Sequence, residues 1–254
     1  MDILSALFRW IHILAGIVWI GMLYFFNFVN GPFQGTLDGE AKKKVNPELL
    51  PRALYWFRWG AAWTWGTGVL LLALVFYHGG IMFDGGGSWG AGGAVMALSV
   101  FVAPFLYDAL HKSPLGKDPK TFGSAAFVLI AATAALMHYW GGFGYRALNI
   151  HLAALLGTIM AFNVWFRIWP AQQTIIKAVK EGTAPDAALV ALAGARSRHN
   201  VYMSVPLFWG MMNQHTTTVS LPGQAGFATF LVVALVGWHV VWQLYKKAPS
   251  VKGF

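Results

Sequence analysis

The sequence predicts an all-α polytopic membrane protein, a single domain over residues 1–254 formed by a bundle of about seven transmembrane helices. Composition is the first reason, because 57% of the residues are hydrophobic and only 11% are charged, whereas a soluble domain carries about 25% charged residues. The second is that apolar runs of about 20 residues, long enough to cross a bilayer as a helix, recur along the whole chain. No stretch leaves room for a separate soluble catalytic domain.

In chain order, the apolar runs predict spans at residues 5–28, 54–77, 92–111, 122–140, 147–168, 199–217 and 225–245. The second span opens with the tryptophan-rich stretch YWFRWGAAWTWGTG, and the sixth contains Pro206, which favours a kink. Before the sixth span we expect a short surface helix, because Thr183 and Asp186 have a capping-box-like spacing. The N-terminal MDILSALF has no basic segment, so no cleaved signal peptide is expected.

The distribution of charge predicts the orientation. Lys and Arg gather in the connections 31–53, 112–121 and 169–198 and in the C-terminal tail. The alternate connections are poor in both residues; these are 78–91, 141–146 and 218–224. Because positive connections stay in the cytoplasm, we expect the N-terminus outside and the C-terminus inside. The net charge of +9 then reflects topology and contact with anionic lipid, and it is no argument for nucleic acid.

The chain contains no cysteine. This excludes disulfides, thiolate metal sites, iron–sulfur clusters and a covalent c-type haem, which needs C-x-x-C-H. A literal G-x-G-x-x-G match, GGGSWG at residues 85–90, lies between two predicted spans. A dinucleotide site would need a strand before it and a helix after it in a βαβ unit. We interpret this stretch as a flexible loop.

Four histidines are predicted to lie at a similar depth near the outer ends of four spans: His12, His138, His151 and His215. Ionisable groups inside a membrane are costly and usually face the bundle interior. For one histidine an interhelical hydrogen bond is the simpler explanation, but four at one level favour a shared site. Without cysteine and with few acids at this level, we expect haem b with His12 as one iron ligand and another of the four as its partner. Zinc is the alternative.

Small and basic residues complete this candidate site. Gly16 lies one helical turn from His12, where it leaves room for a flat ring, although small residues also permit close helix packing. Arg9 and Arg146 are the basic residues on or near the outer face. Both are candidates to pair with haem propionates or an anionic substrate, and contact with lipid headgroups is the alternative.

Two segments resemble the membrane domain of the bacterial cytochrome-c-type urate oxidases (urate hydroxylases). They are RWIHILAGIVWIGMLYFFNFVN, residues 9–30, and SRHNVYMSVPLFWGMMNQH, residues 197–215. The resemblance implies a bacterial inner-membrane domain that oxidises urate and passes electrons to cytochrome c. The residues that carry over are Arg9, His12 and Asn27 from the first segment, and Asn213 and His215 from the second. The first span also has a weaker likeness to small membrane oxidases that oxidise porphyrinogens in haem synthesis.

Members of that family typically end in a cytochrome c domain with C-x-x-C-H, whereas this chain stops after LYKKAPSVKGF. We therefore expect the electron acceptor to be a separate cytochrome c, or another acceptor, on the outer side. Two other classes stay open. One is a non-catalytic or electron-carrying subunit of a larger respiratory or photosynthetic complex. The other is a proton or anion transporter, for which the expected broken helices in paired repeats are not evident.

Overall fold

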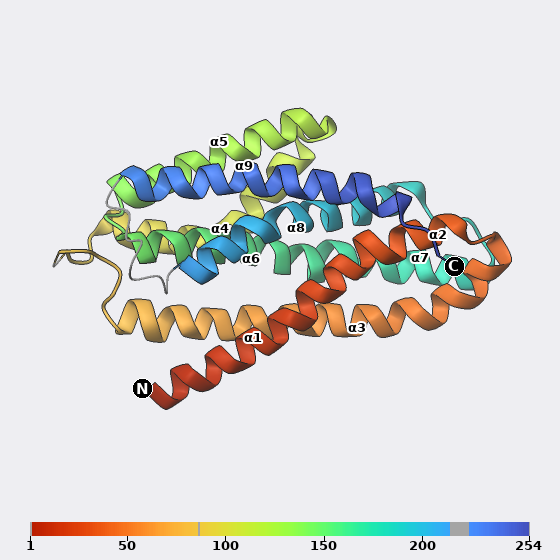
Figure 1. Cartoon of the computed structure of the whole chain (residues 1–254), viewed down its shortest axis with the longest axis horizontal. Coiled ribbons are helices and arrows are strands. Elements are labelled where there is room, and N and C mark those ends of the chain that lie inside the picture. Colours follow the sequence, from red (N-terminus) through yellow and green to blue (C-terminus); the bar gives the residue numbers. More distant parts are fainter. Residues whose placement is uncertain (1, 86, 214–223, 254) are drawn as a thin grey trace. The chain divides into compact units, whose positions relative to one another are not determined.

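The computed structural model describes residues 2–85, 87–213 and 224–253, and this described part is all-helical (Figure 1). The α-helices are α1 (Asp2–Tyr24), α2 (Gly31–Thr36), α3 (Gly39–Leu71), α4 (Ala91–Lys112), α5 (Pro119–Tyr139), α6 (Tyr145–Asn163), α7 (Trp169–Glu181), α8 (Ala187–Asn213) and α9 (Gln224–Lys247). Short 3-10 turns follow α4 and α9, at Pro114–Lys117 and Ala248–Ser250. The predicted all-α class is confirmed.

Six helical stretches of the described residues are long and apolar enough to cross a membrane. They are Ile3–Thr36, Gly39–His78, Ala91–Lys112, Pro119–Tyr139, Tyr145–Glu181 and Gly226–Ser250. These correspond to six of the seven expected spans, as a multi-pass membrane protein requires. The remaining expected span, 199–217, begins within α8, which continues as a helix through Pro206. Its last residues, 214–217, lie outside the described part of the chain.

The segments expected as connections are more helical than predicted. α3 begins at Gly39, inside the expected 31–53 loop, and runs through Pro47 and Pro51. Each proline removes a backbone donor and crowds the carbonyl four residues earlier, but the Ala, Lys, Glu and Leu residues around them favour a helix. The short surface helix expected near Asp186 is instead the first part of α8, whose start Asp186 caps by accepting a hydrogen bond from the Ala188 N–H at 2.8 Å. No proline lies within residues 187–205, so the helix runs without a break into the expected sixth span.

Three π-helical turns join or extend these helices in the described residues: Phe25–Asn30 after α1, Leu72–His78 after α3, and Val164–Ile168 between α6 and α7. A π turn adds a residue to the helical repeat and rotates the side chains that follow it. Residues before and after such a turn therefore do not share the face that a straight helix would give them.

The chain divides into two compact units, each with its own apolar core. Unit 1 comprises residues 1–70, 160–204 and 238–254, and unit 2 comprises residues 71–159 and 205–237. Buried side chains of unit 1 include Trp19, Leu23, Phe57 and Val201. Those of unit 2 include Phe76, Met82, Met137, Phe143 and Leu152.

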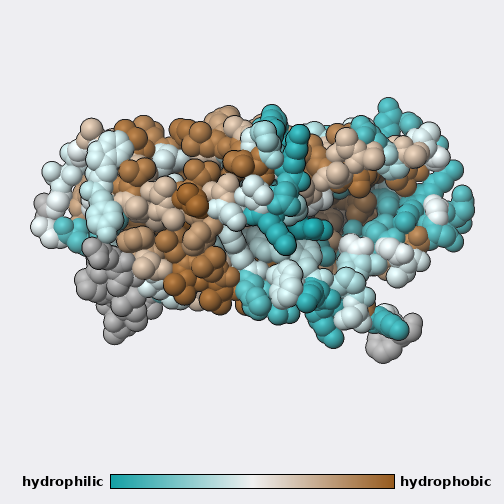
Figure 2. Space-filling view, turned by 90° about the horizontal axis from the view of Figure 1, so that it is seen from above, coloured by the Kyte–Doolittle hydropathy of each residue, from teal (hydrophilic) through white to brown (hydrophobic). Residues whose placement is uncertain are grey.

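Large apolar side chains also lie on the outside of both units. Trp10 and Ile17 of α1 are 62% and 65% exposed, and Phe105 of α4 is 65% exposed. Figure 2 shows hydrophobic residues gathered over a broad part of the face that it displays. Such a surface is unfavourable in water but suits contact with lipid chains.

Candidate functional site

His12 lies on α1 in unit 1, where its ring is half-buried against α3. Its Nδ1 is 2.8 Å from the carbonyl oxygen of Thr64 and 3.3 Å from the hydroxyl oxygen of Thr67. Because a carbonyl oxygen only accepts, Nδ1 carries a hydrogen, and in the neutral form of the ring Nε2 then carries the lone pair. Among the described residues nothing forms a hydrogen bond with Nε2. The ring is therefore held by one nitrogen and keeps the other available as a ligand.

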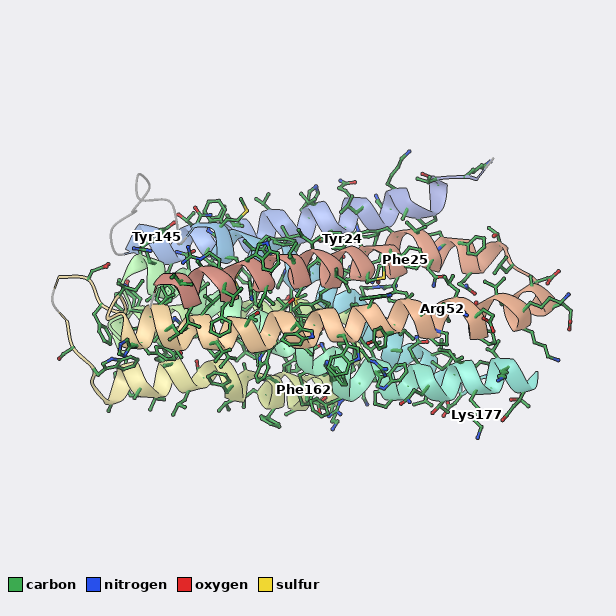
Figure 3. All side chains as sticks on the ribbon, turned by 90° about the horizontal axis from the view of Figure 1, so that it is seen from below. Tyr24, Phe25, Arg52, Tyr145, Phe162 and Lys177 are labelled. Carbon is green, nitrogen blue, oxygen red and sulfur yellow. The ribbon has the colours of Figure 1, made fainter. Side chains whose placement is uncertain are left out.

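A face of small residues on α3 allows this close approach of α1, and the two helices lie side by side in Figure 3. A Cβ on Gly60 would lie 3.0 Å from the backbone nitrogen of Trp19. A Cβ on Gly68 would lie 3.0 Å from Cε1 of His12. Gly16 of α1 faces the Thr64 side chain at 3.8 Å, so its space is used for helix packing, the second of the two interpretations offered above.

The residues that hold His12 were missed by the sequence reasoning. Gly60, Thr64, Thr67 and Gly68 recur at the spacing of one helix face, so GAAWTWGTG carries a small-residue stripe beneath its tryptophans. The stripe predicts close packing with some other helix. It does not reveal which helix, nor that a backbone carbonyl would be the partner of His12.

Asn27 of unit 1 is half-buried and lies in the π turn after α1. Its amide nitrogen donates to the carbonyl of Leu23 and to the hydroxyl of Ser197, both at 2.8 Å. Its amide oxygen accepts from the hydroxyl of Tyr245 at 2.8 Å. The side chain thereby joins the end of α1 to α8 and α9, and these bonds give it a structural role.

Arg9 is exposed and lies one turn before His12 on α1.

In unit 2 His151 of α6 is completely buried, and both of its ring nitrogens are bonded. Nδ1 lies 2.7 Å from the carbonyl of Ala147, and Nε2 lies 3.1 Å from the hydroxyl of Tyr77. Aromatic rings of Phe76 and Phe143 surround it, with ring centroids at 6.0 and 4.8 Å. An iron atom at Nε2 would have to displace the Tyr77 hydroxyl. Both ring nitrogens already form hydrogen bonds within the core of unit 2, which favours a structural role.

His138, also in unit 2, has a different environment at the end of α5. Its half-buried ring lies 4.7 Å from the ring of Tyr139 and is nearly parallel to that of Phe227 at 6.3 Å. In the described part of the chain its nitrogens form no hydrogen bond. His138 and His151 therefore do not share a set of neighbours, and His138 has the freer nitrogens.

The remaining predicted residues are placed as follows. Arg146 is half-buried in the first turn of α6. The Asn213 amide donates to the carbonyl of Trp209 at 3.1 Å, at the end of the described part of α8. His215 lies outside the described residues. Within them, no three His, Cys, Asp or Glu side chains gather as a metal-binding group.

Asp84 is a further polar residue of unit 2 that the sequence reasoning did not single out. Its carboxylate accepts a hydrogen bond from the backbone N–H of Tyr145 at 3.2 Å and packs against Gly144. The Gly144 N–H donates to the carbonyl of Met82 at 2.9 Å. A carboxylate at a helix N-terminus satisfies free donors and is favoured by the helix dipole. Asp84 thus anchors its loop to the start of the helix that carries Arg146 and His151.

Comparison with known proteins decides the family. The model of the family described as Urate oxidase N-terminal matches residues 33–248, most of the chain. The chain belongs to this family. The match begins after the first 32 residues, so it includes His138, Arg146, His151, Asn213 and His215 but not the residues of the first motif. No curated protein and no solved structure shows significant similarity to the chain.

Family membership confirms the resemblance noted in the sequence. It also suggests an oxidoreductase in a multi-pass membrane domain. Arg9, His12, Gly16 and Asn27 precede the matched residues, so the family match does not extend to them.

Proposed function

We propose that this protein is a haem-b-dependent membrane oxidoreductase. It removes electrons from urate, or a similar small planar substrate, and passes them to a cytochrome c on the outer side. Membership of the Urate oxidase N-terminal family supports the reaction class. The observation that carries the cofactor proposal is the hydrogen bond between Nδ1 of His12 and the carbonyl of Thr64, which leaves Nε2 available.

The surroundings of His12 fit a side chain that would hold a haem iron. Ligating histidines usually donate their second N–H to a carbonyl or carboxylate, which fixes the ring and makes the ligating nitrogen more basic. Thr64 supplies that acceptor, and Thr67 offers a second oxygen at 3.3 Å. Because Gly68 has no side chain, the edge of the His12 ring packs directly against α3. A bound haem would supply one-electron chemistry, and these residues would hold and orient its ligand.

Arg9 suits a role beside this ligand. It lies three residues before His12, and residues at this spacing share one side of a helix. Its exposed guanidinium is free to meet a carboxylate, as a haem propionate or an anionic substrate would offer. With the N-terminus outside, as the charge distribution predicts, this end of α1 lies near the outer face, where a cytochrome c would accept electrons.

The first test is an absorption spectrum of the purified protein, oxidised and then reduced with dithionite. We expect the bands of haem b, and we expect His12→Ala to lose or strongly alter them while the protein still inserts in the membrane. His78→Ala is the matched control, because His78 is exposed at the end of the α3 stretch. A His12→Ala protein with unchanged haem content and spectrum would refute the assignment.

The second test concerns the substrate and the acceptor. Urate added to the oxidised protein should reduce its haem, and oxidised cytochrome c added afterwards should be reduced in turn. If cytochrome c stays oxidised while a membrane quinone is reduced, the outer acceptor is wrong. If urate reduces nothing and the chain co-purifies in fixed ratio with other membrane subunits, the electron-carrying-subunit alternative is favoured.

A further inference from the structure

Arg58 is a charged residue within an apolar helical stretch, and its guanidinium in unit 1 is surrounded by aromatic rings. Its central carbon lies 3.9 Å from the ring centroid of Trp169, 5.9 Å from that of Trp165 and 5.8 Å from that of Tyr55. The Trp165 indole N–H donates to the backbone carbonyl of Arg58 at 3.0 Å, which fixes this arrangement. The π turn Val164–Ile168 lies immediately before Trp169 and sets the position of that ring relative to α6.

Aromatic stacking stabilises the faces of a guanidinium but leaves its edges unused. The group has five N–H donors in one plane and no acceptor. Nε of Arg58 is buried without a hydrogen-bond partner. No hydrogen bond or ion pair of the other guanidinium nitrogens occurs within the described residues either. A charge placed in a membrane span without an anionic partner is costly, so the geometry favours an acceptor other than the described side chains.

Exposed aromatic residues of α3 indicate what kind of molecule brings that acceptor. Trp56, Trp59 and Trp63 are 60%, 42% and 58% exposed, and their spacing places them along one side of the helix. Tyr55, in contact with the guanidinium, is 46% exposed. Tryptophan and tyrosine of this kind gather at the level of lipid headgroups. A free anion needs only the charge, whereas a lipid would use both the charge and this aromatic surface.

We infer that Arg58, stacked on Trp169, binds the phosphate group of an anionic phospholipid, whose acyl chains lie along the exposed tryptophans of α3. Two guanidinium N–H groups donate to two phosphate oxygens, the bidentate arrangement that arginine favours. This site does not involve His12 and is independent of the function proposed above. It predicts lipid bound at a defined position, in addition to lipid that surrounds the protein.

The experiment compares lipid retention in variants of the full chain. The protein is purified in detergent and incubated with phosphatidylglycerol, with phosphatidylcholine or with inorganic phosphate, and bound molecules are counted by native mass spectrometry. The wild type should retain one phosphatidylglycerol in preference to phosphatidylcholine. Arg58→Gln should weaken that binding about tenfold. Arg52→Gln is the matched control, because Arg52 (Figure 3) is an exposed arginine of the same helix. Its guanidinium pairs with Glu48.

The outcomes separate the alternatives. Equal phosphatidylglycerol retention by Arg58→Gln and Arg52→Gln would overturn the site. Displacement of the lipid by inorganic phosphate at millimolar concentration would show a free-anion site and would also overturn the lipid assignment. If Arg58→Gln does not fold, Arg58→Lys and Trp169→Leu take its place. Lysine keeps the charge without the planar fork, so weaker retention in both variants supports the site, and wild-type retention in both refutes it.

Discussion

Gly68 of α3 offers a direct test of how His12 is held. A Cβ at this position would lie 3.0 Å from Cε1 and 3.4 Å from Nδ1 of the His12 ring. Carbon atoms in ordinary contact are about 3.5–4.0 Å apart, so Gly68→Ala forces the ring away from α3 by a few tenths of an ångström. That movement lengthens the 2.8 Å hydrogen bond to the Thr64 carbonyl. Loss of such an orienting partner typically costs about 10–100-fold in metal affinity. We expect haem binding to weaken about tenfold, with a shifted Soret band.

Protein stability should respond differently from haem binding. Alanine in place of glycine favours a helix by about 1 kcal/mol, while overpacking a contact costs about 1–3 kcal/mol. The two effects oppose each other, so the unfolding midpoint of the Gly68→Ala apoprotein should change little or fall modestly. Gly66→Ala is the matched control, because a Cβ there meets nothing within 4 Å.

The assay is reconstitution of each apoprotein with haem in detergent, followed optically, with thermal unfolding measured on the same samples. We expect Gly66→Ala to bind haem as the wild type does. If Gly68→Ala and Gly66→Ala give the same haem affinity and the same spectrum, the ring of His12 does not ligate through the geometry described, and the reasoning fails.

Three further predictions concern other parts of the chain. His151→Phe should lower the unfolding midpoint, because it removes the hydrogen-bond partner of the half-buried Tyr77 hydroxyl, at a cost of about 1 kcal/mol; the haem spectrum of the variant should stay that of the wild type. Asn27→Ala removes a side chain with three hydrogen bonds and should destabilise the fold by about 2 kcal/mol or more in denaturant titration. At the start of α5, hydrogen bonds from the Thr121 backbone N–H and then from its hydroxyl lower the pKa of Asp118. A lowered folded-state pKa gives stability that is present above the unfolded-state pKa and is lost as pH falls through the folded-state value. Asp118→Asn should remove this part of the acid sensitivity, and an unchanged stability profile between about pH 2 and 6 would contradict it.

The membrane spans could be predicted because a bilayer imposes a simple rule on sequence. Every backbone polar group in the hydrocarbon must be bonded within the chain, so long apolar runs become helices. Six of the expected spans correspond to such helices. No comparable rule governs the segments outside the hydrocarbon. The helical stretches before Leu54 and before His199 carry mixed polar residues, and nothing in their hydropathy separates a continuing helix from a loop.

The contacts of the candidate site were harder to predict, because they depend on backbone atoms and on distant side chains. The partner of His12 is a main-chain carbonyl, which every residue of α3 possesses. The Tyr77 hydroxyl that bonds His151 is 74 positions away in the sequence. The π turn at Phe25–Asn30 also rotates Asn27 from the face that a straight first span would give it. Only the small-residue stripe of α3 could have been identified beforehand.

The histidines that were predicted to lie at one depth in the membrane therefore differ in their ability to bind a metal. To bind a metal, a neutral imidazole needs one nitrogen with a free lone pair and gains from a partner that fixes the hydrogen on the other. His151 has both nitrogens bonded within its core, so its burial and hydrogen bonds favour a structural role. His138 has free nitrogens but no hydrogen-bond acceptor among the described residues to orient its ring. His12 combines an oriented ring with a free nitrogen. A histidine whose proton is fixed by the fold is a better ligand than one chosen by depth alone, and for this reason His12 is the first position at which the proposed haem should be tested.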